Sequence, residues 1–468
     1  MNLKQMFSAK DMTIGSPVKR IMEFSIPMLI GNIAQQLYNT ADSVIVGHYV
    51  GDNALAAVGS ASPILNLLLA LFVGISTGAG IIVSQSFGAK DRERLSKGIG
   101  NCIALTFIAT IVIMIVGPII TMPMLKLLDT PASIIDWCAD YLNIYFLGII
   151  GFFFYNMLSG ILRGLGDSLS ALGFLLLAAA LNVVLDLWFV GGFGMGVPGV
   201  ALATIISQAI SAVFCFLKLM RMSEHFDLNR STVKLDKTVA MRILTIGIPS
   251  GITQAIMSMS MMVVQSLTNS MGEMVIAANV IIMRVDGFAM MPNFTFGQAM
   301  SVYTGQNVGA GKWDRVQKGV RQGSILAQSV AVVLVLAILV FGKYLFGIFT
   351  TTPELIDLAE RMMRIMAVGY VAISITQVLG GVMRGCGDTV TPMWISIINT
   401  VVLRVPLAYI LAHYTTSTAW PNGHPYALSI SLLVTWVLGM VFSVIAFRYG
   451  KTRKMVRSEM AKQIEAEL

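Results

Sequence analysis

Long apolar stretches separated by short polar segments run through almost the whole sequence. They lack the alternation of apolar and polar residues that marks a membrane β-strand, and they exceed the about ten residues that such a strand needs. A helix that crosses a membrane needs about 20 mostly apolar residues. The pattern therefore predicts an all-α polytopic membrane protein with twelve membrane-spanning helices. We place these spans at 21–46, 54–83, 99–122, 136–160, 168–190, 197–220, 243–270, 274–303, 320–345, 360–380, 390–413 and 425–448.

The positions of Lys and Arg orient these helices, because loops on the cytoplasmic side of a membrane are rich in basic residues. Basic residues cluster before the first span, in the loops after even-numbered spans and in the C-terminal tail. The loops on the opposite side hold Lys126 and Lys343. We therefore expect a multi-pass protein of the cytoplasmic (inner) cell membrane, with both termini in the cytoplasm.

An internal repeat divides the chain. Gln85–Ala89 reappears as Gln306–Ala310, and Arg163–Asp167 reappears as Arg384–Asp388, both at a shift of 221 positions. Chance matches do not keep one constant shift, so the sequence predicts two six-helix halves. We interpret the repeated Arg-Gly-x-Gly-Asp segments as short turns, in which Gly supplies backbone freedom and Asp caps the next helix, rather than as phosphate-binding loops.

The repeat predicts an N-terminal lobe at 1–228 and a C-terminal lobe at 229–468. Because six is even, both halves enter the membrane from the same side and are related by an axis along the membrane normal. That architecture places a substrate cavity between the lobes near the midplane, which rocking opens to alternate sides.

Composition excludes several classes of protein. Hydrophobic residues make up 56% of the chain and charged residues 12%, whereas a soluble domain carries about 25% charged residues. The net charge of +8 follows the membrane topology, so we expect no nucleic-acid partner. The sequence holds no HExxH, GxSxG or Walker motif, its four His residues are scattered, and its four Cys residues form no CxxC pair. We therefore expect neither an enzyme nor a cofactor.

Polar residues deep in the first span are candidates for a functional site, since an ionisable group at the centre of a membrane helix costs about 2.5 kcal/mol or more. Gln35, Asn39 and Asp42 follow one another at spacings of four and three, with Tyr38 beside them. These spacings place Gln35, Asn39 and Asp42 on one helix face.

A second set of polar residues lies in the fifth and sixth spans. Asn182 and Asp186 are four apart and share a face, and Thr204 follows in the next span. Together with Asp42 they offer two carboxylates, an amide and a hydroxyl, which are oxygen ligands that suit Na⁺. Two carboxylates in one apolar site equally suit a proton carrier, because both cannot stay charged without a cation.

Structural alternatives stay open for each residue. For Asp42 the alternative is a buried structural hydrogen bond. For Asp186 it is a position near the outer interface, where water solvates it. Asn182 and Thr204 are types that commonly bridge membrane helices.

With these motifs in place, the sequence resembles the multidrug and toxic compound extrusion (MATE) family of antiporters, of the DinF/MepA-like type. The resemblance covers nearly the whole chain and rests on the Gln-x-x-Gly-Ala segment and the Arg-Gly-x-Gly-Asp turn of each half, and on Asp42 within Ala41–Gly47. It implies a V-shaped pair of six-helix bundles. It also implies export of cationic and amphipathic compounds in exchange for Na⁺ or H⁺.

The resemblance further implies a cation site in the N-terminal lobe, on the residues that match Asp42, Asn182, Asp186 and Thr204. The NorM-like branch of the family instead needs an acid in the seventh span. Span 243–270 contains none, which argues against a NorM-type site.

The substrate cavity is predicted from polar and flexible residues near these spans. Asp286 is an intramembrane acid that would attract a cation; an internal salt bridge is the alternative. Methionine thioethers suit a pocket that accepts many shapes, although ordinary packing explains them too. The predicted lining is Gln35, Tyr38, Asn39, Asn156, Met257, Met261, Asp286 and Met290.

These inferences favour a secondary antiporter that exports cationic or amphipathic small molecules by alternating access, with H⁺ or Na⁺ as the coupling ion. We expect a monomer whose other partner is the lipid bilayer. The alternative is a flippase for a lipid-linked precursor from the same superfamily. Such flippases usually have extra helices and a cationic cavity, whereas the clearest intramembrane cluster here is acidic.

Overall fold

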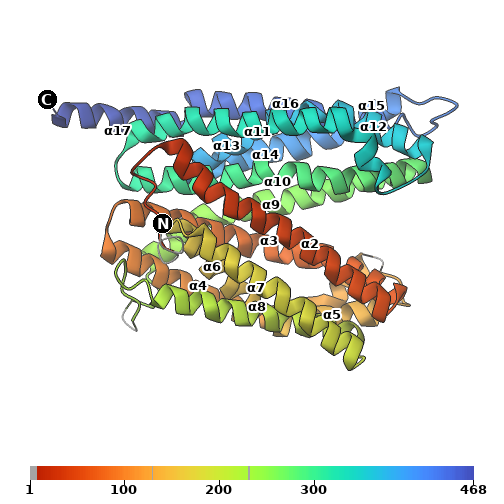
Figure 1. Cartoon of the computed structure of the whole chain (residues 1–468), viewed down its shortest axis with the longest axis horizontal. Coiled ribbons are helices and arrows are strands. Elements are labelled where there is room, and N and C mark those ends of the chain that lie inside the picture. The colour runs from red at the N-terminus through yellow and green to blue at the C-terminus, as the bar shows by residue number, and fades with distance from the viewer. Residues whose placement is uncertain (1–7, 129, 230–231, 468) are drawn as a thin grey trace. The chain divides into compact units, whose positions relative to one another are not determined.

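The computed structural model describes residues 8–128, 130–229 and 232–467, and these residues form helices joined by short loops (Figure 1). The first half contains α2 (Pro17–Tyr49), α3 (Asp52–Gly88), α4 (Arg92–Leu127), α5 (Ile135–Leu147), α6 (Ile149–Gly164), α7 (Ser168–Asp186), a π-helical segment (Leu187–Gly192) and α8 (Gly196–Met220). The second contains α9 (Lys237–Ser270), α10 (Glu273–Gly309), α11 (Trp313–Gly347), α12 (Pro353–Ala367), α13 (Gly369–Gly385), α14 (Val390–Ile397), a π-helical segment (Ile398–Arg404), α15 (Val405–Tyr414), α16 (Tyr426–Tyr449) and α17 (Lys451–Glu467).

Membrane-spanning helices confirm the predicted fold class. Among the described residues, nine helices are long and apolar enough to cross a membrane. The count is eleven if α5 with α6, bent by 54°, and α12 with α13, bent by 45°, each form one span. The remaining predicted span, 21–46, lies on α2, which is 33 residues long but is not among the apolar helices. Its Gln, Asn and Asp residues lower its hydropathy, so the count of twelve is not confirmed.

The helices form two compact units. Unit 1 comprises residues 1–11 and 26–251, and unit 2 comprises residues 12–25 and 252–468. The predicted lobes had their boundary between residues 228 and 229. In the structure α2 and α9 are continuous helices whose first turns belong to one unit and whose remaining turns belong to the other.

Equivalent turns repeat in the two halves. Gly51 directly precedes α3 and has φ 103°, and Gly272, 221 positions later, directly precedes α10 and has φ 100°. Such angles suit glycine because a side chain rarely adopts them. Asp167 accepts a hydrogen bond from the Ser170 backbone N–H at 2.9 Å. Asp388 accepts the equivalent bond from Thr391 at 3.1 Å, so the Asp residues of the repeated turns cap helices, as predicted.

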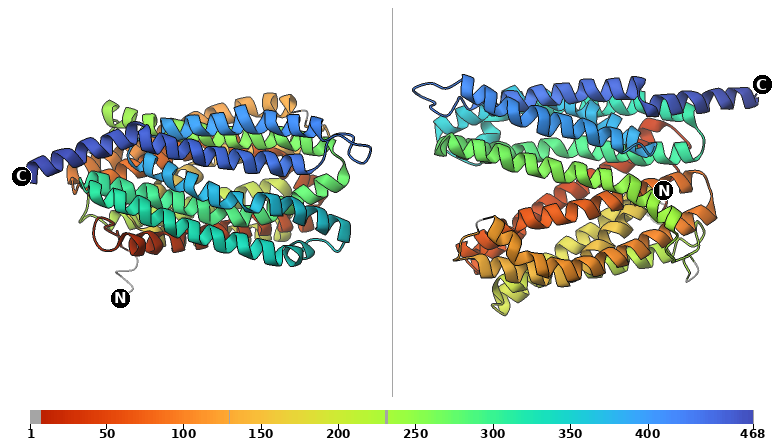
Figure 2. Two further views of the ribbon diagram at one scale, coloured as in Figure 1. Left: turned by 90° about the horizontal axis from the view of Figure 1, so that it is seen from above. Right: turned by 180° about the vertical axis from the view of Figure 1, so that it is seen from behind.

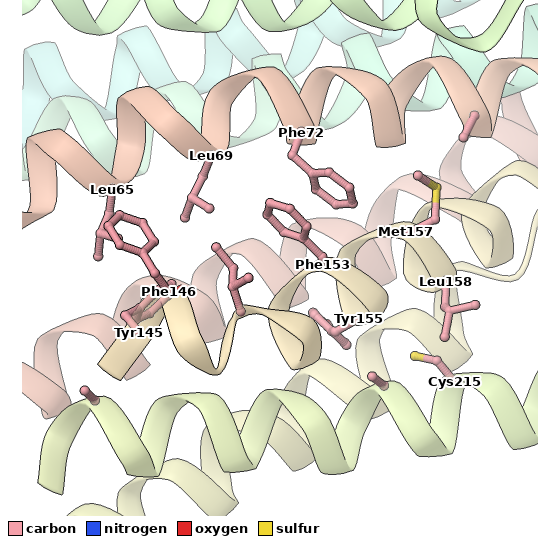
Figure 3. Close-up of a cluster of buried hydrophobic side chains, with 14 of the residues drawn as sticks. Leu65, Leu69, Phe72, Tyr145, Phe146, Phe153, Tyr155, Met157, Leu158 and Cys215 are labelled. Carbon is pink, nitrogen blue, oxygen red and sulfur yellow. The ribbon is translucent and has the colours of Figure 1, made fainter. Parts of the chain in front are cut away.

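A hydrophobic core holds unit 1 together where α3 faces α5, α6 and α8 (Figure 3). The rings of Phe72 on α3 and Phe153 on α6 stack with centroids 3.7 Å apart. Tyr145 at the end of α5 is also buried in this core, with 5% of its surface exposed. The core therefore fixes the position of α5 beside the polar cluster described below.

Glycines allow α3 and the first turns of α9 to cross at close range within unit 1. A Cβ atom added to Gly74 would collide with the backbone of Gly251, and one added to Gly78 would meet Gly247 N at 2.7 Å. Small residues are the usual means of bringing membrane helices into backbone contact.

Candidate cation site

Helix α2 positions Tyr38 and Asp42 of the candidate site. The two residues are four apart, so both side chains leave the same face of the helix. The Oδ1 atom of Asp42 is buried. Burial removes a carboxylate oxygen from water, which costs free energy. A nearby cation or hydrogen-bond donor is needed to offset that cost.

Helices α7 and α8 supply the opposite wall. Asn182 and Asp186 are fully buried on one face of α7. The Asn182 amide donates a hydrogen bond to Thr204 Oγ1 on α8 at 3.3 Å. The Thr204 hydroxyl in turn donates to the Val200 carbonyl at 3.1 Å. Because Asp186 has no exposed surface, the alternative of an acid solvated by water at the outer interface does not describe this structure.

The two walls meet at the acids. The carboxyl groups of Asp42 and Asp186 lie close enough to interact with each other, and the Tyr38 hydroxyl lies close to Thr204. The structure thus brings together all four residues of the predicted cation site, and Tyr38 of the predicted cavity with them. Two carboxylates this close repel each other, so a proton or another cation is needed to stabilise the pair.

Two tyrosines were missed by the sequence analysis. Tyr141 and Tyr145, one turn apart on α5, are buried with 7% and 5% of their surfaces exposed. Tyr141 lies close enough to interact electrostatically with Tyr38, Asp42 and Asp186. Nothing in the sequence distinguishes these tyrosines from other interfacial aromatics, because their proximity to the acids arises only when α5 packs beside α2 and α7.

The donor set suits a proton or a monovalent cation. Within the described part of the chain, no group of three or more His, Cys, Asp and Glu side chains is placed to hold a metal ion. Asp42 and Asp186 supply two carboxylates, and Asn182 and Thr204 supply an amide and a hydroxyl. This set can balance one or two positive charges by moving a proton or by binding Na⁺.

Asp286, the acid of the predicted substrate cavity, has a different surrounding in unit 2. The Tyr370 hydroxyl on α13 donates a hydrogen bond to Asp286 Oδ1 at 2.5 Å. Arg404 lies near enough to act electrostatically on the same carboxylate. A donor and a cation of the protein itself therefore partly compensate Asp286.

The other predicted cavity residues lie in several surroundings. Gln35 and Asn39 are exposed on α2, and the Asn156 amide donates to the Phe152 carbonyl at 2.8 Å. On α9, Met257 is half-buried and Met261 is exposed. Met290 belongs to the buried hydrophobic core of unit 2, which is the packing position that the alternative interpretation expected.

The repeated Gln-x-x-Gly-Ala segment has a structural role in unit 2. Gln306 Oε1 accepts a hydrogen bond from the Met12 backbone N–H at 2.8 Å. Asn307 donates to the Met12 carbonyl at 3.3 Å, and Arg315 donates to the Gly15 carbonyl at 2.9 Å. The segment thus anchors the chain that leads into α2.

Comparisons with known proteins agree with this architecture. The MatE family model matches residues 27–188 and again residues 249–410, which confirms the internal repeat. The probable multidrug resistance protein YoeA of Bacillus subtilis is 31% identical over 424 residues, covering 88% of this chain and 91% of YoeA. The multidrug export protein MepA of Staphylococcus aureus is 24% identical over 378 residues, covering 80% of this chain and 83% of MepA.

Solved structures show the same fold. A crystal structure described as MATE in the straight conformation superposes with a TM-score of 0.86 at 25% identity, covering 97% of this chain and 100% of that chain. Together with the two matches of the family model, this likeness extends over both halves. The chain therefore belongs to the MatE family of multidrug efflux transporters.

Proposed function

We propose that this protein is a secondary antiporter, which exports cationic or amphipathic small molecules across the cytoplasmic membrane in exchange for a cation. The relatives named as multidrug resistance and export proteins support the export of small molecules. The observation that carries the coupling mechanism is the contact between Asp42 and Asp186 in the buried wall of unit 1.

Coupling follows from the energetics of this acid pair. Two buried carboxylates cannot both remain charged and uncompensated, so the site takes up a proton, a Na⁺ ion or a cationic substrate. Each ligand shifts the balance between inward-open and outward-open states only by the difference in its affinity for them. If substrate and coupling ion favour different states, alternating access exchanges one for the other.

We take H⁺ as the coupling ion. The carboxyl groups of Asp42 and Asp186 lie close together, and a proton shared between them would remove their repulsion. Na⁺ is the alternative, supported by the Asn182 and Thr204 oxygens, and it would have to replace this proton. Asp42 and Asp186 are the coupling residues in either case, and Tyr38 and Tyr141 position them.

The proposal is tested in proteoliposomes that contain the purified full-length protein. A proton gradient should drive uptake of an organic cation such as ethidium, and a Na⁺ gradient at constant pH should not. Asp42→Asn should abolish the gradient-driven component, whereas Asp136→Asn, the same change at an exposed position on α5, should retain it. Gradient-independent movement of a lipid-linked pyrophosphate, without cation transport, would instead support the flippase alternative.

We also propose that both termini lie in the cytoplasm, on the basis of the basic loops. The four native cysteines are buried, so they give little background in a labelling experiment. Cysteines introduced at Asn229, in the central loop, and at Ala419, before α16, should react with an impermeant thiol reagent from opposite sides of the membrane. Reaction of both from one side would contradict this topology.

A further inference from the structure

A basic pocket opens where the last membrane helix of unit 2 ends. It has a volume of about 700 Å³ and lies between the first turns of α11, the end of α16 and the start of α17. Figures 1 and 2 show α17 continuing from α16 past the end of α11. The basic side chains that line it are Lys318, Arg321, Arg448, Arg453 and Arg457.

The lining holds five basic side chains and one acidic side chain. Asp314 is the acidic residue of the lining, and its carboxylate pairs with Lys318 at 3.4 Å. Arg321, Arg448 and Arg457 are exposed at the pocket. Arginines that converge from three helices form a site for a planar or tetrahedral anion, because each guanidinium offers a fork of N–H donors.

The matching face of unit 1 is closed by the protein itself. Arg321 corresponds at the 221-residue shift to Gly100 of α4, where an added Cβ atom would collide with the Thr232 carbonyl. The same central loop supplies Asp227, which pairs with Arg92 of α4 at 2.7 Å. In unit 1 the central loop thus covers the face of α4 and pairs with its arginine, whereas the equivalent face of α11 in unit 2 is open and basic.

The position of the pocket indicates the kind of anion. Arg448 and Tyr449 form the end of α16, the last apolar span, and Phe447 and Tyr449 line the pocket beside the arginines. Aromatic and basic residues at the end of a membrane helix lie at the level of lipid headgroups. The topology proposed above places this pocket on the cytoplasmic side, where basic pockets bind acidic lipids.

We propose that this pocket binds the phosphate group of an anionic phospholipid. The arginines hold the phosphate, and the aromatic rings contact the lipid chains at the membrane edge. This site is separate from the candidate cation site, and its occupation does not depend on the proposed transport activity.

The test measures lipid binding to the full-length protein in neutral detergent by native mass spectrometry. Phosphatidylglycerol should bind at least tenfold more tightly than phosphatidylcholine. The double variant Arg321→Gln/Arg457→Gln should lose about tenfold or more of that affinity, since each basic residue near a lipid headgroup adds appreciable attraction. Arg321→Lys/Arg457→Lys keeps the charge and should recover most of the loss.

The matched control is Lys451→Gln/Lys454→Gln. It removes the same charge from exposed positions of α17 that do not line the pocket, and it should change the affinity less than twofold. Equal losses in both double variants would overturn the proposal, since they would indicate general surface charge. So would an unchanged affinity in the pocket variant, or binding of inorganic phosphate without preference for phosphatidylglycerol over phosphatidylcholine.

Discussion

The two halves of this protein share their turns but differ in their interiors. Helices α3 and α10 are both 37 residues long and begin at equivalent glycines. The acids within the helices are not repeated. The repeat aligns Asp42 with the apolar residue Val264, and it aligns Asp286 with the apolar residue Leu65. The acid of unit 1 lies beside a second acid, whereas that of unit 2 accepts a hydrogen bond from a tyrosine. The repeat thus preserves the glycines at the helix starts, whereas the acidic residues inside the helices differ between the two halves.

The strongest test of this asymmetry is the exchange of each acid for its amide. Asp42→Asn should reduce gradient-driven transport to the level of protein-free liposomes, because the amide cannot bind or release a proton. Asp286→Asn should retain coupled transport, because Tyr370 and Arg404 already compensate this carboxylate. Equal loss of coupling in the two variants, measured in the same uptake assay, would show that the halves share the coupling function.

The pair should also act as one unit. Asp186→Asn alone should impair coupling nearly as much as Asp42→Asn, and the double variant should be no worse than the more severe single variant. Residues in direct contact give such non-additive effects. Multiplicative losses in transport rate, measured for all three variants, would indicate that the two acids work independently.

Packing supplies a third contrast between the halves. Position 74 in unit 1 is glycine, and its counterpart in unit 2 is Thr295. Gly74→Ala should lower the free energy of unfolding by about 1–3 kcal/mol, the usual cost of overpacking, since the new methyl group collides with the Gly251 backbone. Gly59→Ala on the same helix meets open space and is the control. Thermal denaturation in detergent would compare them, and equal stability would contradict the close crossing.

A smaller effect is expected at Asp286. Removal of its negative charge by Asp286→Asn should weaken binding of a cationic substrate by up to tenfold, or about 1.4 kcal/mol, if the cation still senses this partly compensated charge. Tyr370→Phe keeps the charge and removes one donor, so it should leave cation affinity unchanged or slightly increased. Equilibrium binding of a fluorescent cation measures both. Weaker binding after Tyr370→Phe would mean that the hydroxyl itself contacts substrate.

The smallest effect concerns the central loop, which packs against α4 in unit 1. Hydrogen bonds from Arg92 lower the pKa of Asp227 below its ordinary value. The ion pair therefore stabilises the loop above pH of about 4, the ordinary pKa of an aspartate, and this stabilisation is lost as the pH falls through the lowered pKa. Asp227→Asn should raise loop proteolysis slightly at neutral pH. Because the pair is exposed, salt should reduce this difference, and a salt-independent difference would point to another cause.

Much of the fold was predictable because its signals are local. The length of the apolar stretches predicted the membrane-spanning helices, and the constant shift of 221 residues predicted the internal repeat. The sequence also correctly assigned Asp167 and Asp388 to helix caps. The spacing of Asn182 and Asp186 identified one wall of the site. The bends at α5–α6 and α12–α13, and the division of α2 and α9 across the two units, were not predicted, because they depend on packing against distant helices.

The sequence by itself determined which side chains were too polar for a membrane interior, and it placed Asp42, Asp186, Asn182 and Thr204 on their helices. Helical periodicity sufficed for this, because it relates residues three and four apart. Only the tertiary structure decided that Asp42 meets Asp186, while Asp286 meets Tyr370. Those contacts join residues 144 and 84 positions apart, and such distances are closed by helix packing, which no local pattern encodes.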